Sequence, residues 1–263
     1  NYIKPTLKNI DHWFLKETLE SLFGIRDLIE QIKPKKIKNF FLINLLSVVR
    51  RVSKATTQQG RLFLDIETAQ KDALSFFLKK IETNKVIISK LKNNKKIIVK
   101  NEDAFNLSSN KNRYKLIILH PPYFNSYKYS SVNSLEAFVM GIDVDEFRKQ
   151  EVREFFKVGK AENHKKYVED MTNIINHSYK ILKKNGYLAI MFGDAFIKDE
   201  YIQVVRKTLE KTKIKKKNIH KIVLRVPKFT ESSWVSSQRR KGNTVGINLF
   251  DYVVLIKKSR SEE

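Results

Sequence analysis

A short apolar run that ends at two consecutive prolines constrains the fold of this chain more than any other stretch. Residues 116–119 are Leu-Ile-Ile-Leu, a pattern typical of a strand buried in a sheet. The next residues are His120, Pro121, Pro122 and Tyr123. Proline has no backbone N–H and cannot extend a ladder of hydrogen bonds, so the strand must end there. Open α/β sheets place their ligand sites at such carboxyl ends of buried strands.

The first 92 residues predict a helical segment. Apolar residues recur at helical spacing over residues 11–33, 36–51 and 66–91. Residues 53–64 show no clear period, so we expect a polar loop there. We interpret the apolar faces of these helices as core packing rather than as a cofactor groove.

The remainder of the chain predicts an α/β sheet, because short strands alternate with helices from residue 93 onward. The expected strands lie at residues 96–99, 116–119, 187–192, 219–226 and 252–256. The expected helices lie at residues 132–140, at residues 165–184 before the helix-stop pair Asn185-Gly186, and from residue 199 onward. We therefore expect two parts, a helical segment over residues 1–92 and an α/β domain over residues 93–263.

The charge balance indicates a polyanionic partner. The chain carries 52 lysines and arginines against 28 aspartates and glutamates, a formal net charge of +24 that is spread along its length. Nucleic acid is the simplest such partner, bound through its phosphates. The alternative is a lysine-rich chain whose charges only face solvent.

Several classes of site are excluded or disfavoured by composition. There is no cysteine, which excludes disulfides, thiolate metal ligands and cysteine nucleophiles, and fits a reducing, cytoplasmic location. The five histidines lack metal-ligand spacing, so we predict no metal site. No apolar run approaches the roughly 20 residues that a membrane span needs, so we expect no membrane partner.

The motif at residues 120–123 resembles the Asp/Asn/Ser-Pro-Pro-Tyr/Phe motif of the amino DNA methyltransferases. This family makes N6-methyladenine or N4-methylcytosine from S-adenosyl-L-methionine. Residues 167–171, leading to residues 181–187 and then to Gly193-Asp194, are similar to the family's passage of helix, turn, strand and Gly-Asp, and residues 99–105 are similar to its Gly-Asp-Ala segment. The resemblance implies a partial Rossmann-like class I methyltransferase sheet with a helical segment before it.

The resemblance assigns catalytic duties to His120, Pro121, Pro122 and Tyr123. The side chain of His120 and the carbonyl of Pro121 would accept hydrogen bonds from the target amino group, and the prolines would fix the carbonyls in place. Tyr123 would stack on a base flipped out of duplex DNA.

The resemblance also implies binding residues for the cofactor and for double-stranded DNA. Asp103, Ala104 and Phe105 would border the adenosine of S-adenosyl-L-methionine. Asp194 is a further cofactor candidate, with the capping of a turn as its alternative. The expected DNA contacts are Asn125 and Tyr127 after the motif, and Lys228, Arg239 and Arg240 in a basic loop. That loop equally suits an ordinary solvated connection.

Two features depart from the family pattern. Position 120 is a histidine, which is bulkier than Asp, Asn or Ser, and which accepts one hydrogen bond through a neutral ring nitrogen. The family's Phe-x-Gly-x-Gly cofactor loop has no counterpart after any apolar strand, although the chain has eight glycines. We therefore expect an upstream segment or a second polypeptide to carry that loop and complete the sheet.

The resulting hypothesis is a site-specific DNA methyltransferase, or the half of one that carries the catalytic motif, acting in a restriction-modification or related system. Its target would be the exocyclic amino group of adenine or cytosine. Two alternatives stay open. The first is a non-catalytic, methyltransferase-like DNA-binding subunit, which His120 and the missing glycine loop favour. The second is a methyltransferase that acts on RNA or protein.

Overall fold

The computed structural model describes residues 9–58, 61–65, 67, 71–91, 97–105, 113–124, 129–151, 163–197, 200–225 and 251–259. Contacts divide the chain into two compact units. The first comprises residues 1–98 and 128–151, and the second comprises residues 99–127 and 152–263. The sequence indicated one boundary near residue 92 and did not anticipate that residues 128–151 pack with the first unit.

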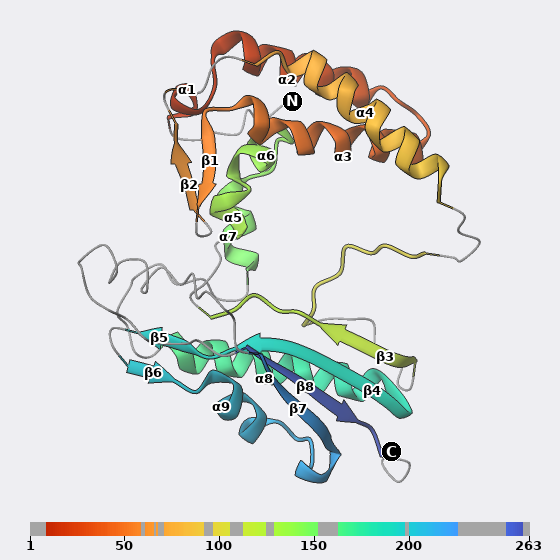
Figure 1. The fold of residues 1–263 in the computed structure, drawn as a ribbon, viewed down its shortest axis with the longest axis vertical. Helices are drawn as coiled ribbons and strands as arrows, with labels where there is room; N and C mark the ends of the chain where they lie inside the picture. The colour runs from red at the N-terminus through yellow and green to blue at the C-terminus, as the bar shows by residue number, and fades with distance from the viewer. Residues whose placement is uncertain are drawn as a thin grey trace. The chain divides into compact units, whose positions relative to one another are not determined.

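The first unit is mainly helical (Figure 1). Its helices are α1 (Ile10–Trp13), α2 (Lys16–Glu30), α3 (Lys35–Val52), α4 (Ala73–Ser89), α5 (Tyr129–Val132), α6 (Ser134–Val139) and α7 (Val144–Gln150). Its strands β1 (Ala55–Gln58) and β2 (Arg61–Leu64) form an antiparallel pair. Apolar side chains that include Leu22, Leu45, Val48 and Leu135 form its core.

Two arginines hold residues 128–151 against the first helices. Arg26 of α2 donates from Nη1 to the carbonyl of Val139 at 2.9 Å. Arg50 of α3 donates from Nη2 to the carbonyl of Val132 at 2.9 Å and pairs with Glu136 at 2.8 Å. Charged donors that satisfy buried carbonyls fix the position of a helix more firmly than apolar contact alone.

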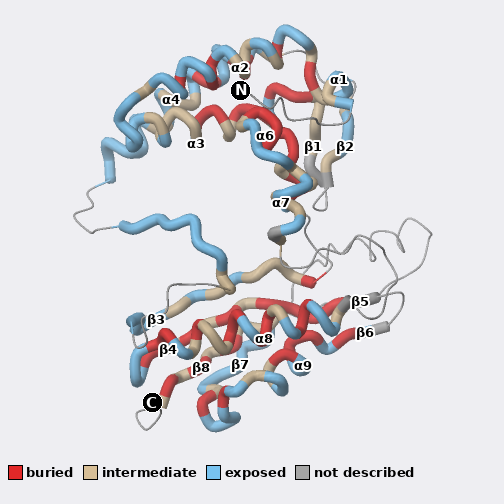
Figure 2. Tube along the Cα trace, turned by 180° about the vertical axis from the view of Figure 1, so that it is seen from behind, coloured by how far each residue is buried: buried red, intermediate tan, exposed pale blue. Residues whose placement is uncertain are grey.

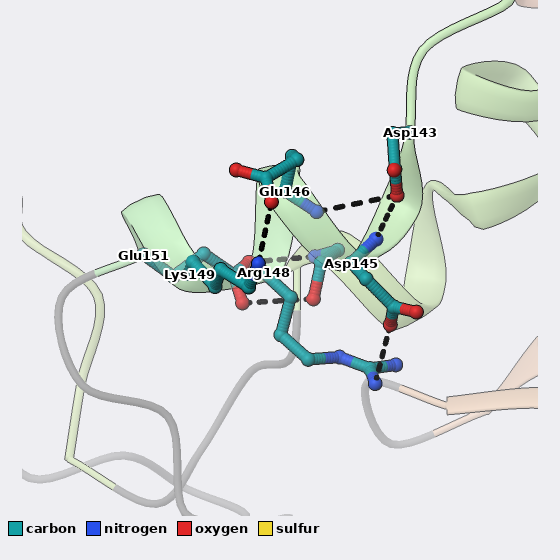
Figure 3. A network of polar contacts seen from close by, with 7 residues as sticks. Asp143, Asp145, Glu146, Arg148, Lys149 and Glu151 are labelled. Carbon is teal, nitrogen blue, oxygen red and sulfur yellow. Dashed lines mark hydrogen bonds and ion pairs between the residues drawn. The ribbon is translucent and has the colours of Figure 1, made fainter.

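Helix α7 shows how local charge sets a helix boundary (Figure 3). The carboxylate of Asp143 accepts from the backbone N–H of Asp145 at 2.8 Å and of Glu146 at 3.3 Å, so it caps the first turn. Ion pairs join Arg148 to Asp145 and Lys149 to Glu146 three residues apart.

The second unit is built on a four-stranded mixed sheet in the order β3-β4-β8-β7 (Figure 1). Strand β3 (Tyr114–Leu119) is parallel to β4 (Leu182–Gly193), whereas β8 (Asp251–Lys257) and β7 (Ile219–Arg225) add antiparallel. Helix α8 (Asn163–Ile181) links β3 to β4, and α9 (Val204–Lys211) follows the small hairpin of β5 (Ala195–Ile197) and β6 (Glu200–Ile202). A 3-10 turn, η1 (Lys216–Asn218), precedes β7. The predicted α/β fold is confirmed.

Both helices cover the same face of this sheet. Leu188, Ile190 and Phe192 of β4 and Val254 and Ile256 of β8 are buried against apolar residues of α8 and α9. In Figure 2 both helices lie in front of the strands. The core of the second unit is therefore a single layer between the sheet and these two helices.

Strand β3 is an edge with one uncovered face. Among the described residues it pairs with β4 alone. Ile117 and Leu119 point into the core, but Leu116 and Ile118 on the other face are 55% and 73% exposed. An exposed apolar edge strand is a template for further pairing.

Four expectations about individual elements were wrong. Residues 53–64 contain the β1–β2 pair rather than a loop, because four paired residues per strand are too few to establish a visible period. Residues 97–99 form no strand, and Val99 is 90% exposed, because no described strand lies beside them to pair with. The helix expected from residue 199 begins at Val204, since Glu200–Ile202 pairs with β5.

The fourth error concerns the end of α8, which stops at Ile181 rather than at residue 184. Buried Lys258 donates from Nζ to the carbonyls of Lys180 at 3.1 Å and Leu182 at 2.9 Å, which satisfies groups at the carboxyl end of the helix. Asn185 takes a left-handed φ of 60°.

Other boundaries differ by less. The helix expected over residues 11–33 is interrupted between α1 and α2, and the helix expected from residue 66 is capped by Asp72, whose carboxylate accepts from Leu74 N and Ser75 N, both at 3.1 Å. The expected helix at residues 36–51 and the strands at residues 116–119 and 252–256 are confirmed by α3, β3 and β8. The strand expected over residues 219–226 is confirmed by β7 as far as Arg225, and residue 226 lies outside the described residues.

Gly186 is required by space. A Cβ atom there would lie 2.8 Å from the carbonyl oxygen of Lys183 and 2.9 Å from that of Lys115, so Gly186→Ala should strain the β3–β4 pairing. We expect it to lower the free energy of unfolding by about 1–3 kcal/mol, as overpacking does. Gly24→Ala is the matched control, because a Cβ at Gly24 meets nothing within 4 Å, and it should stabilise α2 by about 0.5–1 kcal/mol. Urea unfolding followed by circular dichroism measures both changes; equal stability of Gly186→Ala and the unmodified chain would contradict the first.

Candidate active site

The predicted catalytic motif leaves the sheet directly after β3. Leu119 pairs with Ile190 in the parallel register. The motif and Gly193-Asp194 therefore both leave the sheet at the carboxyl ends of these two strands. His120 is exposed, Pro121 to Tyr123 are half-buried, and Phe124 is part of the core of the second unit. The structure thus brings together the two passages that carry the resemblance to the methyltransferase motifs.

Tyr167 of α8 contacts this loop through a hydrogen bond and a ring contact. Its hydroxyl donates to the carbonyl of Pro122 at 2.6 Å. Its ring lies 5.2 Å from that of Phe124, between centroids, at an interplanar angle of 58°. Burial, first of all, raises the pKa of the Tyr167 hydroxyl, so it remains a donor across the physiological range. The sequence placed Tyr167 at the start of a passage that resembles the family but gave it no role, because its contact with the loop depends on how α8 packs.

His120 and Tyr123 pack against each other at the surface of the loop. Their ring centroids are 5.6 Å apart and the rings are perpendicular. This contact orients a nitrogen-bearing ring and a phenol ring on one short, proline-stiffened segment. The arrangement offers a hydrogen-bond acceptor next to a flat stacking surface.

Two charged residues from the other strands act on Tyr123. Burial and the negative charge of Asp251, opposed by the positive charge of Arg225, raise the pKa of the Tyr123 hydroxyl to about 12. A hydrogen bond to Asp251 contributes in the same direction. Arg225 and Asp251 are themselves paired at 3.2 Å, from the adjoining ends of β7 and β8. Sequence reasoning did not identify either residue, since only the antiparallel pairing of these strands brings them to the motif.

Asp194 is buried, and both of its carboxylate oxygens have partners. One accepts from the hydroxyl of Tyr201 at 2.5 Å, and the other accepts from the backbone N–H of Val205 at 2.9 Å. Burial and the bond to Asp194 raise the pKa of Tyr201. These bonds anchor the first turn of α9, as expected for a capping carboxylate. A cofactor contact for Asp194 stays a prediction.

A cavity of about 520 Å³ opens beside Asp194. Tyr252 of β8, Ile222 of β7 and Val205 and Leu209 of α9 line it, so it lies on the helix-covered face of the sheet. The largely apolar lining suits an apolar or aromatic group rather than a charged one.

The second group of predicted cofactor residues lies on an exposed turn. The carboxylate of Asp103 accepts from the backbone N–H of Phe105 at 3.0 Å, and Lys100 pairs with Glu102 at 2.6 Å. Asp103 is exposed, whereas Ala104 and Phe105 are half-buried. Within the described ranges, no hydrogen bond or ion pair joins residues 100–105 to the catalytic motif. Their predicted contact with the cofactor stays a prediction.

The predicted DNA contacts lie outside the described residues: Asn125, Tyr127, Lys228, Arg239 and Arg240. They stay predictions. In the part of the chain that the structure describes, no group of three or more histidine, aspartate or glutamate side chains is arranged to hold a metal ion. No helix among the described segments has the length and apolar character of a membrane span.

Comparison with known proteins agrees with the geometry of the loop. Residues 114–261 match the model of the N6/N4 methyltransferase family, described as DNA methylase, and this match covers more than half of the chain. The chain therefore belongs to the DNA methylase family, which confirms the resemblance of the motifs. None of the curated protein sequences compared with the chain matches it significantly.

Solved structures of two DNA methylases are among those similar to this fold. One is TTHA0409 of Thermus thermophilus, described as a DNA modification methylase and crystallised with S-adenosyl-L-methionine. It is 11% identical, at a TM-score of 0.36, over 61% of this chain and 55% of that chain. The other is the PvuII DNA methyltransferase, specific for cytosine N4. It is 13% identical, at a TM-score of 0.38, over 59% and 47%. The chain thus spans about half the length of each protein.

The two charges near Tyr123 predict that two substitutions shift its pKa in opposite directions. Asp251→Asn should lower the pKa of Tyr123 from about 12 toward, but not to, its ordinary value, because burial remains. Arg225→Gln should raise it, because the opposing cation is lost. Difference titration of tyrosinate absorbance, each protein against its Tyr123→Phe counterpart, measures both.

The phenol proton of Tyr123 also makes the free energy of unfolding depend on pH in the alkaline range. The folded state holds it more tightly than the unfolded chain, so its contribution is fully present below about pH 10 and is lost as the pH rises toward about 12. An identical Tyr123 pKa in the Asp251→Asn and Arg225→Gln proteins would refute the assigned electrostatics.

Proposed function

We propose that this chain carries the base-binding half of an S-adenosyl-L-methionine-dependent DNA amino-methyltransferase. The observation that carries the proposal is the loop of residues 120–123 at the carboxyl end of β3, which Tyr167 holds and which leaves the sheet at the same end as Gly193-Asp194. The chain's membership in the DNA methylase family supports it. The target is an exocyclic amino group of adenine or cytosine in duplex DNA, and a restriction-modification or related system would be its setting.

The hydrogen bond from Tyr167 supports a division of labour between the two proline carbonyls. The carbonyl of Pro122 already accepts from Tyr167 at 2.6 Å. The preceding carbonyl, that of Pro121, is therefore our candidate acceptor for one N–H of the target amine. A neutral ring nitrogen of His120 is the candidate for the other N–H. Two acceptors in this position would hold the amine planar and orient its nitrogen toward the methyl donor.

Tyr123 suits the stacking of a flipped base. A half-buried phenol ring beside the His120 ring offers a flat surface, and base–aromatic stacking is worth about 1–3 kcal/mol per base. Its raised pKa keeps the phenol neutral, so no tyrosinate charge opposes the approach of DNA phosphates. The excess of lysine and arginine supports binding of the phosphate backbone.

The described residues do not by themselves form a cradle for S-adenosyl-L-methionine, the group that would supply the methyl. Both oxygens of Asp194 are bonded internally, and Asp103 lies on an exposed turn. We propose that a segment upstream of residue 1, or a second polypeptide, supplies the glycine-rich loop and a strand beside β3. Within the described segments one side of β3 has no partner strand, and this and the exposure of Leu116 and Ile118 support the completion.

A non-catalytic DNA-binding subunit is the second candidate. His120 in place of Asp, Asn or Ser favours it, because an imidazole is larger and accepts only one hydrogen bond when neutral. The internal bonding of Asp194 favours it as well, since a carboxylate so engaged has less capacity to bind a ligand.

Transfer of labelled methyl groups to duplex DNA decides between the two. We expect incorporation when the chain is combined with the completing segment or polypeptide. Tyr123→Ala should then reduce the rate roughly 10- to 100-fold, in line with the loss of about 1–3 kcal/mol of stacking. Tyr114→Ala, an exposed tyrosine at the opposite end of β3, is the control and should change it less than twofold.

His120 gives a second arm of the same assay. His120→Asn restores a residue that the family motif uses and should retain or raise the rate, whereas His120→Ala should lower it. Absence of methyl incorporation in every combination, with calorimetry showing no binding of S-adenosyl-L-methionine, would leave the non-catalytic subunit. Stronger competition by RNA than by duplex DNA would replace DNA with RNA as the substrate.

A further inference from the structure

A second, polar cavity lies in the second unit, at the end of β4 that is opposite the catalytic motif. It has a volume of about 340 Å³ and is formed where β4 begins, β7 begins and β8 ends. Asn185, which lines the cavity, is five residues before Ile190, the partner of Leu119, which at about 3.3 Å per residue places the cavity roughly 17 Å from the end of β3 where the catalytic motif begins. The proposed methyltransferase site does not involve it.

The side chains around this cavity are almost all hydrogen-bond donors. Four are basic: Lys217, His220, Lys257 and Lys258. The others are two amides, Asn185 and Asn218, and the hydroxyl of Ser259. Among the described residues that line it, none is a carboxylate. A concave site lined by several cations focuses a positive potential on its interior.

The floor of the cavity is fixed by buried polar groups. Lys258 is 4% exposed, and its ammonium is bound by the carbonyls of Lys180 and Leu182. Asn218 is 5% exposed, and its side-chain amide donates to the hydroxyl of Tyr179 at 2.6 Å. A charge held at a set position by such bonds does not lose side-chain entropy when a ligand arrives.

Lys217 and Lys257 supply two further cations to the lining of the cavity. In the described part of the chain, neither Lys217 nor Lys257 forms an ion pair. The Lys257 ammonium lies 5.4 Å from the centroid of the Tyr187 ring, and the His220 ring packs against that tyrosine at 5.8 Å. Like charges that converge on one cavity repel one another, and an anion between them would relieve this repulsion.

We propose that this cavity binds a phosphate group. A phosphate carries up to two negative charges and presents several acceptor oxygens, so it can bond to lysine, imidazole and amide donors that arrive from different directions. A carboxylate has fewer acceptor directions for the same donors. The lysine-rich segment of residues 211–217, whose last residue lines the cavity, extends the positive field beyond it. The phosphate can come from a nucleic-acid backbone or from a free phosphorylated molecule.

Titration with inorganic phosphate at constant ionic strength tests the site. The amide resonances of Asn185, Asn218 and Ser259 should shift and saturate on addition of phosphate, and Lys217→Gln/Lys257→Gln should weaken the binding at least tenfold. The control is Lys79→Gln/Lys90→Gln, which removes the same charge from exposed lysines of the first unit and should change the affinity less than twofold. Lys217→Gln alone repeats the test at an exposed side chain outside the strands, in case the double variant folds poorly.

Three outcomes overturn the proposal: unshifted amides, shifts that equal amounts of chloride reproduce, or equal losses of affinity in the cavity and control variants. Short duplex DNA with and without 5′-phosphates, and a nucleoside monophosphate, identify the source of the phosphate once the site is established. Weaker binding of every duplex by the cavity variant assigns it to the backbone, and an effect on the free phosphates alone assigns it to a small ligand. Methyl transfer is measured separately, so failure here leaves the proposed function untouched.

Discussion

The parallel pairing of β3 with β4 is the constraint on which the candidate site depends. It aligns the carboxyl ends of the two strands, so the His-Pro-Pro-Tyr loop and the Gly193-Asp194 turn emerge at one edge although they are about seventy residues apart. The crossover helix α8 follows from the same pairing, because parallel neighbours need a long connection. That helix in turn brings Tyr167 beneath the loop, where its hydroxyl fixes the Pro122 carbonyl.

Electrostatics are distributed unevenly over the second unit. Around the motif the carboxylates have partners: Asp251 forms an ion pair with Arg225, and Asp194 accepts hydrogen bonds from the Tyr201 hydroxyl and from the backbone N–H of Val205 in α9. At the opposite end of β4, lysines and a histidine line one cavity, and no carboxylate is among the described residues that line it. A net charge of +24 therefore does not produce a uniform positive potential. The local potential depends on which cations lie near carboxylates.

Sequence reasoning succeeded where the signal was local. The Leu-Ile-Ile-Leu run, the proline stop and the alternation of elements after residue 93 predicted β3, the motif loop and the α/β class correctly. It failed where the structure of a segment depends on whether another strand pairs with it. Residues 97–99 look like a strand, yet they remain unpaired and exposed, because an isolated apolar run has no ladder to join. The β1–β2 pair was missed because its stability comes from cross-strand contact rather than from a period.

By itself, the sequence determined which residues the loop contains: the prolines that stop the strand, the tyrosine proposed to stack on the base, and the histidine in the leading position. Only the tertiary structure decided which groups surround that loop. Tyr167, Arg225 and Asp251 reach it from three other elements, and Asp194 turns toward α9. The reason is physical: backbone stops act within a few residues, whereas hydrogen bonds, burial and charge act between residues that only the pairing of strands and the packing of a helix bring together.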